Sequence, residues 1–245
     1  MNMTRPKRAP SGIDGLMERA SQALVETRYF ECERLSLEAL RLAHTAGDYE
    51  RMARVLMPLQ EARRQKRLAA VDAGKVRVLN AIIPEDQPIQ RGVYVIEPPL
   101  VGANGRDLRD RADEQGVAVL VLVREPQTRT GQWPVVMVGP VTVRTKVAPP
   151  ANGTPTLEWV QAATEALGDH AISEVDPQDE VFSRVDQLLS YLGTMTDHEK
   201  LHQALAAACR EAAAESARGI TSAASKRKPK PVTRLLDDDA EDAEA

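Results

Sequence analysis

The chain has 245 residues, of which 42% are apolar and 28% charged, so it can form a core and matches neither a disordered nor a membrane protein in composition. Aromatic residues make up only 3%, which argues against an all-β sandwich or barrel and against a protein that stacks many bases. The formal net charge is −4, yet Lys and Arg outnumber Asp and Glu in residues 1–70, and the reverse holds in residues 151–218.

Two features of the chain bear on its location. No apolar segment follows the basic N-terminal residues, and the longest apolar run, Val117–Val123, is far shorter than the ~20 residues that a membrane-spanning helix needs. The two cysteines, Cys32 and Cys209, are far apart in sequence and form no CxxC pair, so a disulfide framework is not expected. We therefore expect a cytoplasmic protein with reduced thiols and no membrane partner.

Residues 11–70 have the apolar spacing of helices. Ahead of them, residues 1–10 are basic and polar, and we expect a flexible arm. A second helix is predicted over Phe30–Ala46, and Asp48 is placed to cap a third. Pro58 lies inside the third pattern and is expected to kink or divide that helix, because proline lacks the amide donor.

The helical region carries an aromatic residue, Tyr29, at a helix turn, with Cys32 three positions later and the small–large pair Ala39–Leu40 further along. In these residues it resembles a tetratricopeptide repeat, a helical hairpin packed through small side chains. A Gly-Asp-Tyr turn follows the second predicted helix in the same manner. The resemblance implies a unit that presents a partner-binding surface rather than a catalytic centre.

Residues 74–149 change from helical to strand-like patterns. A helix over Gly105–Gln115, with Asn104 as its N-cap, is predicted between the second and third strands. A strand–helix–strand unit favours parallel pairing and the later short connection favours antiparallel pairing, so we expect a mixed sheet of four or five strands. The strands are predicted within residues 76–83, at Gly92–Ile96, at Val117–Val123, and as two short strands after Trp133.

Residues 150–217 form an acidic helical section. Thr154 and Asp176, each followed by a proline, are expected to cap its first two helices. The last helix is predicted over Asp197–Ser216, and residues 218–245 have the biased composition of a disordered tail. The complete prediction is an α+β fold, with an N-terminal helical unit, a small mixed sheet with a crossover helix, and C-terminal helices.

The last predicted helix begins with His198-Glu199-Lys200-Leu201-His202, the HExxH spacing. On a helix this spacing places two imidazoles one turn apart, where they can share a zinc ion while Glu199 activates water. Over these five residues the chain resembles the zincin metallopeptidases, which implies zinc bound by His198 and His202 and Glu199 as the catalytic base. A third ligand would have to come from upstream, for example from His170. The alternative is structural, because Thr196 and Glu199 fit a capping box.

A second short motif contains Gly102 and Gly105. These glycines, with Leu108 and the closing Gln115-Gly116-Val117, resemble the GxxG stretch of KH RNA-binding domains, in which the loop lies against the nucleic-acid backbone. The resemblance implies nucleic-acid contacts at Gly102 and Gly105. However, the positive and negative charges of the following helix balance, whereas phosphate binding needs a positive excess. The alternative is an ordinary strand-to-helix turn.

These observations favour a non-catalytic cytoplasmic interaction or scaffold protein that binds a protein partner or a second copy of itself. A zinc-dependent hydrolase and an RNA-binding adaptor are the alternatives that the two motifs define. Within the leading hypothesis no cofactor is expected, and the sequence does not identify the partner-binding residues.

Overall fold

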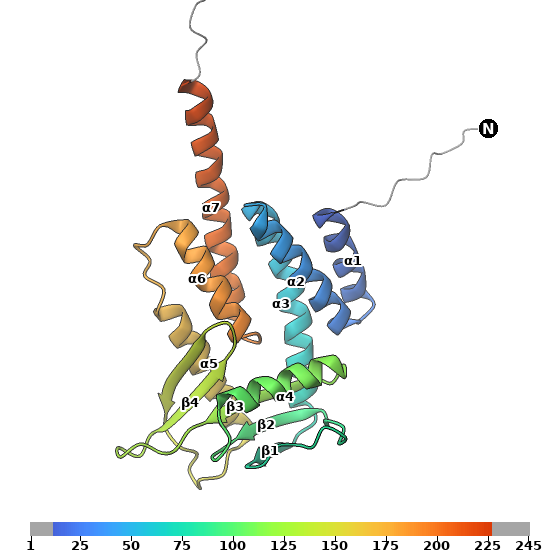
Figure 1. The fold of residues 1–245 in the computed structure, drawn as a ribbon, viewed down its shortest axis with the longest axis vertical. Helices are drawn as coiled ribbons and strands as arrows, with labels where there is room; N and C mark the ends of the chain where they lie inside the picture. Colours follow the sequence, from blue (N-terminus) through green and yellow to red (C-terminus); the bar gives the residue numbers. More distant parts are fainter. Residues whose placement is uncertain (1–11, 227–245) are drawn as a thin grey trace, which may run out of the picture. The chain divides into compact units, whose positions relative to one another are not determined.

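The computed structural model describes residues 12–226 and has the predicted α+β fold (Figure 1). Its helices are α1 (Ile13–Val25), α2 (Tyr29–Thr45), α3 (Tyr49–Val71), α4 (Gly102–Glu114), α5 (Leu157–Ser173), α6 (Val181–Thr194) and α7 (Glu199–Lys226). Its strands are β1 (Val76–Leu79), β2 (Gly92–Ile96), β3 (Val119–Arg124), β4 (Trp133–Val138) and β5 (Thr142–Val147).

The five strands form one mixed sheet in the order β1-β2-β3-β4-β5. The first three strands are parallel to one another, with Val76 opposite Val93 and Val93 opposite Leu120. The last two pairs, β3–β4 and β4–β5, are antiparallel, as the short connections predict. The predicted first strand is too long, because β1 ends at Leu79 and the following apolar residues belong to the connection to β2.

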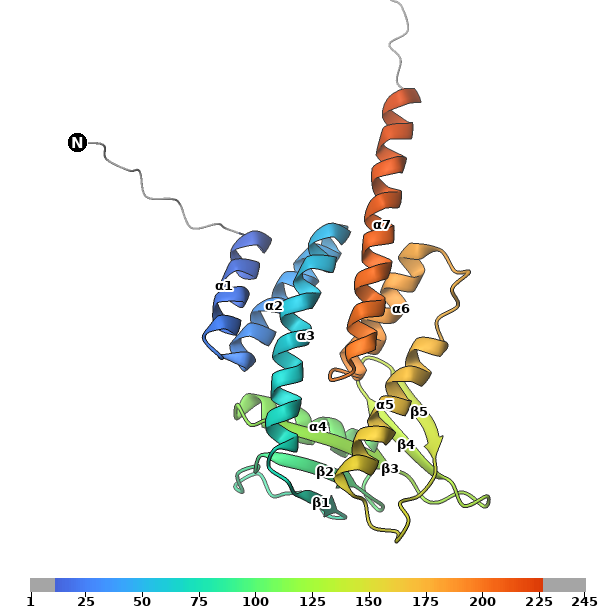
Figure 2. The same ribbon diagram turned by 180° about the vertical axis from the view of Figure 1, so that it is seen from behind.

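Helices cover both faces of the sheet (Figures 1 and 2). Successive strand residues point to opposite faces, so each strand contributes to two separate apolar clusters. One cluster contains sheet residues that pack with α3 and α5, namely Val93, Val95, Leu120, Leu122, Val135 and Met137. The other contains sheet residues that pack with α4, namely Tyr94, Ile96, Val121, Val123 and Val136. This two-sided burial explains the continuous apolar runs of β2 and β3.

The three N-terminal helices pack closely through small buried side chains, among them Ala20, Ala39 and Ala43. Asp48 caps α3 as predicted, because its side chain accepts a hydrogen bond from the backbone amide of Arg51 at 3.0 Å. Pro58 does not divide α3, which is one helix from Tyr49 to Val71. The first part of this long helix packs with α1 and α2, and its last part reaches the sheet.

Several helices begin at other residues than predicted. Helix α4 starts at Gly102 rather than Gly105, so Asn104 lies inside its first turn, where its side chain accepts a hydrogen bond from the amide of Val101. Helix α5 starts after Thr156, which accepts a hydrogen bond from the amide of Trp159. Thr154 is therefore not its N-cap.

The predicted starts of the last two helices are also too early. Asp176 accepts a hydrogen bond from the amide of Gln178 in a turn, and α6 begins only at Val181. Helix α7 begins at Glu199 rather than Asp197.

The chain divides into two compact units, the first of which ends at Ala213. Helix α7 continues to Lys226, past residue 217, so the predicted start of the tail is too early. Residues 227–245 and the predicted basic arm, residues 1–10, lie outside the described residues. None of the described helices combines the length and apolarity that crossing a membrane requires.

Candidate functional site

A buried cluster of charged side chains lies where α2 and α3 meet. Glu33 of α2 accepts a hydrogen bond from Nε of Arg63 at 2.7 Å and one from Nζ of Lys66 at 2.6 Å. Arg63 and Lys66 share a face of α3 because they are three residues apart. Burial alone would raise the pKa of Glu33, but attraction to the two cations outweighs burial and lowers the pKa to about 2. Glu33 is therefore ionised inside the protein.

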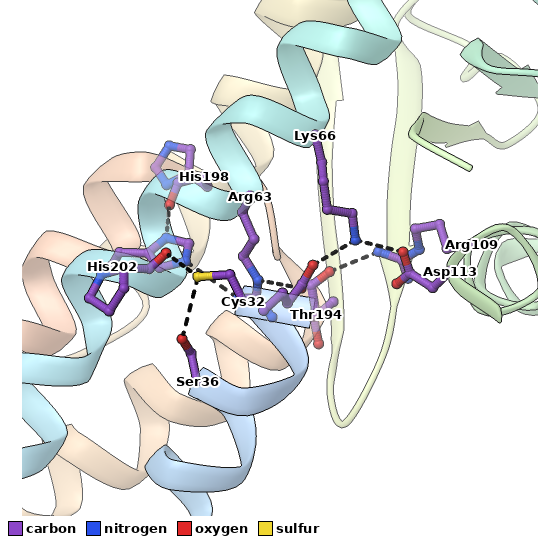
Figure 3. Close-up of polar contacts among 11 residues, drawn as sticks. Cys32, Ser36, Arg63, Lys66, Arg109, Asp113, Thr194, His198 and His202 are labelled. Atoms are coloured by element: carbon purple, nitrogen blue, oxygen red, sulfur yellow. Dashed lines mark hydrogen bonds and ion pairs between the residues drawn. The ribbon is translucent and has the colours of Figure 1, made fainter. Parts of the chain in front are cut away.

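Lys66 extends from this cluster to α4. Its ammonium lies 2.6 Å from Oδ1 of Asp113 (Figure 3). The same ammonium lies 4.3 Å from the centroid of the Phe30 ring. Burial would lower the pKa of Lys66, but the nearby carboxylates of Glu33 and Asp113 raise it overall. One ammonium group is thus held by two carboxylates and an aromatic face, the combination that proteins use to bind cationic ligands.

Lys66 is one of the residues that line an open groove with a volume of about 560 Å³, which we name the α2–α4 groove. Four carboxylates line it against two cations, together with two apolar side chains, one of which, Leu37, is 40% exposed. Its lining residues are Phe30, Glu31, Glu33, Arg34, Leu37, Lys66, Asp113 and Glu114. Arg28 and Arg63, which lie outside this lining, pair with Glu31 and Glu33, and Lys66 pairs with Asp113. Glu114 is therefore the one lining carboxylate without an ion pair among the described residues, and the groove is partly apolar.

The first histidine of the HExxH motif, His198, directly precedes α7 and faces α5. Its ring is buried against Gly168, and Nε2 lies 3.3 Å from a carboxylate oxygen of each of Glu165 and Asp169. Neither ring nitrogen makes a hydrogen bond of good geometry within the part of the chain that the structure describes. Burial lowers the pKa of His198, with the two carboxylates opposing that shift.

The second histidine, His202, faces α3 instead. Its Nε2 lies 3.4 Å from Nη1 of Arg63 and its Nδ1 lies 2.9 Å from the backbone oxygen of His198 (Figure 3). A guanidinium can only donate, so Nε2 accepts from Arg63 and Nδ1 carries the proton that His198 O accepts. Burial, aided by the charge of Arg63, lowers the pKa of His202 to about 3.

This arrangement gives the zinc hypothesis no support. The two rings face different helices, and the Nε2 lone pair of His202 already accepts a hydrogen bond from Arg63. Glu199 accepts a hydrogen bond from Arg67 at 3.3 Å rather than closing a capping box with Thr196. Among residues 12–226, no three His, Cys, Asp or Glu side chains are grouped to hold a metal ion.

The neutral state of His202 gives a pH prediction. The ordinary pKa of histidine, 6.5, exceeds the folded value of about 3, so the unfolded chain binds the proton more tightly. The stability that neutral His202 contributes is present above pH 6.5 and is lost as the pH falls towards 3. In His202→Gln, whose amide oxygen can still accept from Arg63, the free energy of unfolding should fall less between pH 6.5 and 4.5. Urea denaturation across that range measures the difference, and equal slopes in both proteins would contradict it.

Gly102 and Gly105 both lie within the first turns of α4 and face the sheet. A Cβ at Gly102 would overlap Val138, and one at Gly105 would overlap Val123. The missing side chains thus allow α4 to approach β3 and β4 closely. Packing accounts for both glycines, and the KH-like contact remains a prediction without support from this geometry.

The groove residues were missed by the sequence interpretation, although one signal for the cluster was present. Leu56, Leu59, Arg63, Lys66 and Ala70 recur every three or four residues, so Arg63 and Lys66 occupy core-facing positions of α3. A charged residue in an apolar stripe indicates a buried partner. Nothing local identifies Glu33 or Asp113 as the partners.

Comparison with known proteins yields no match to a protein-family model, a curated protein or a solved structure. The tetratricopeptide resemblance of the three N-terminal helices therefore stays a prediction. Function has to be inferred from the groove and the charged cluster beside it.

Proposed function

We propose that this protein is a non-catalytic interaction protein that binds a basic segment of a protein partner in the α2–α4 groove. The observation that carries the proposal is the environment of Lys66, whose ammonium lies between Phe30 and the carboxylates of Glu33 and Asp113. Lys66 already pairs with Glu33 and Asp113, so Glu114, which has no ion pair among the described residues, is the carboxylate that would pair with a partner's cation.

The charges at the rim support a basic partner. Glu114 makes no ion pair or hydrogen bond with any residue that the structure describes, and it is exposed beside the paired Asp113. Leu37 and Phe30 offer apolar contacts for the methylene groups of a lysine or arginine side chain. An acidic peptide or a phosphate backbone would meet repulsion from the same carboxylates.

The environments of several buried ionisable groups support a non-catalytic role. Glu33 and Arg63 neutralise each other, and His202 is neutral with both nitrogens engaged. Burial raises the pKa of the Cys209 thiol to about 12 and also raises that of Cys32, so neither thiol is activated as a nucleophile. Two free, buried thiols also fit the proposed location in the cytoplasm.

A labelled peptide tests the groove. A short fluorescein-labelled oligolysine should bind the full chain at low ionic strength, as measured by fluorescence anisotropy. Glu114→Gln removes one rim charge and Phe30→Leu removes the aromatic face while retaining an apolar side chain. Each variant is expected to bind roughly threefold more weakly, the size expected for one exposed charge or one cation–π contact.

The matched control is Glu18→Gln on α1, an exposed position outside the groove that loses the same charge. Its affinity for the peptide should be unchanged, and circular dichroism should show that all three variants are folded. The proposal is wrong if oligolysine does not bind, or if Glu18→Gln weakens binding as much as Glu114→Gln does.

A further inference from the structure

We infer that a second groove, between α3 and α7, binds an acidic segment of a protein partner that also carries an apolar side chain. This groove has a volume of about 510 Å³, and we name it the α3–α7 groove. It shares no lining residue with the α2–α4 groove, so it is a separate surface. Its lining residues are Glu50, Ala53, Arg54 and Met57 of α3 and Arg210 and Ala213 of α7.

Apolar side chains make up half of this lining. Met57 is 75% exposed, and among the described residues only Val25 is a more exposed large apolar side chain. Ala53 and Met57 are four residues apart, so they lie on the same face of α3, and Ala213 faces the groove from α7. Methionine is flexible and polarisable, and it adapts its shape to an apolar partner. The groove therefore offers an apolar contact that is open to solvent in this chain.

The charged side chains of the groove leave an excess of one positive charge. Arg54 and Arg210 are set against Glu50 alone. None of these three side chains makes an ion pair or a hydrogen bond with a residue that the structure describes. Asp14 is near enough to interact with the charge of Arg54, but it is already paired with Arg51. Arg54 and Arg210 are thus available to bind carboxylates of a partner.

The combination of groups favours an acidic protein segment over other anions. Carboxylates of the segment can pair with the two arginines while a neighbouring apolar side chain covers Met57. A nucleic acid could pair with the arginines through its phosphates, but the groove has no aromatic ring on which bases could stack. Two helices that flank an apolar groove are also the setting in which an amphipathic helix docks with its apolar face inwards.

The test uses the full chain and a fluorescein-labelled peptide of glutamate and leucine in an amphipathic helical pattern. Fluorescence anisotropy at low ionic strength measures its binding. The double variant R54Q/R210Q should bind the peptide roughly tenfold more weakly, because each exposed charge pair contributes about threefold. Met57→Gln keeps the length of the side chain but replaces its apolar end by an amide, and it should also weaken binding roughly tenfold.

Matched controls lie at exposed positions outside the groove. R19Q/R129Q removes the same two positive charges, and Val25→Gln replaces a similarly exposed apolar side chain. Both controls should bind the peptide as the unmodified chain does, and circular dichroism should show that all variants are folded. The inference is refuted if the peptide does not bind, or if the control variants weaken binding as much as the groove variants.

Two further measurements address other occupants of the groove. If labelled oligothymidine binds as tightly as the peptide and Met57→Gln does not weaken it, the groove binds nucleic acid and the inference is wrong. If sedimentation velocity shows a dimer that Met57→Gln dissociates, a second copy of the chain occupies the groove, which also overturns the inference. Neither result affects the proposed binding of oligolysine in the α2–α4 groove, because the two grooves have no residue in common.

Discussion

Arg63→Leu is expected to lower the free energy of unfolding by about 3–5 kcal/mol, the usual cost of removing one partner from a buried ion pair. The side chains of Arg63 and Glu33 are only 4% and 10% exposed. Without Arg63, Glu33 has a single cationic partner, Lys66, which also pairs with Asp113. His202 loses its donor at the same time. Urea denaturation at neutral pH measures the change.

The neighbouring residue provides a control for this prediction. Arg64 pairs with Glu61 on the surface of the same helix, and both side chains are 37% exposed. Arg64→Leu should therefore change the free energy of unfolding by less than ~0.5 kcal/mol. Equal effects at the two positions would show that burial of the cluster does not stabilise the fold.

Acid should remove the same stabilisation. The folded pKa of Glu33, about 2, lies below its ordinary value of 4.5, so the stabilisation is complete above pH 4.5 and is lost as the pH falls towards 2. Arg63→Leu should weaken this acid dependence, because the cation that lowers the pKa most is gone.

Gly168→Ala is expected to cost about 1–3 kcal/mol, the range for overpacking a core, although alanine is the better helix former. The added Cβ would overlap the ring of His198, with Nδ1 only 2.6 Å away. The ring is buried, so it cannot turn into solvent to make room. Thermal and urea denaturation should both show the loss.

A second substitution isolates the cause. In a His198→Ala background the ring is absent, and Gly168→Ala should then be neutral or stabilising by up to ~1 kcal/mol. If Gly168→Ala costs as much in that background as in the unmodified chain, the overlap with His198 is not the reason for its effect.

Local patterns predicted most elements of the fold, since apolar periodicity and turn residues are encoded in short stretches of sequence. They failed at helix starts, because Thr154, Thr156 and Asp176 are all acceptable caps locally. The packed structure selects Thr156 and leaves Asp176 in a turn. At Pro58 the local sequence predicts a kink or a break. Helix α3 nevertheless continues through the proline, because it is packed on both sides of it.

The candidate site was less accessible from sequence. The HExxH spacing predicts two histidines on one face, but His198 contacts Glu165 of α5 and His202 contacts Arg63 of α3. Only the packed structure shows these different partners. The groove depends on Lys66 meeting Glu33 and Asp113, which lie on separate helices. Periodicity marks which residues face inwards, but it does not say what they face.

Helix α3 belongs to two packing layers at once, and this affects how the protein folds. Its first part is buried by α1 and α2, and its last part covers β2 and β3. Separation of α1 and α2 from α3 would therefore expose apolar surface of the helix that also covers the sheet. Helices α1–α3 and the sheet are therefore expected to unfold in one cooperative transition. A ligand that binds the α2–α4 groove would then raise the melting temperature of both.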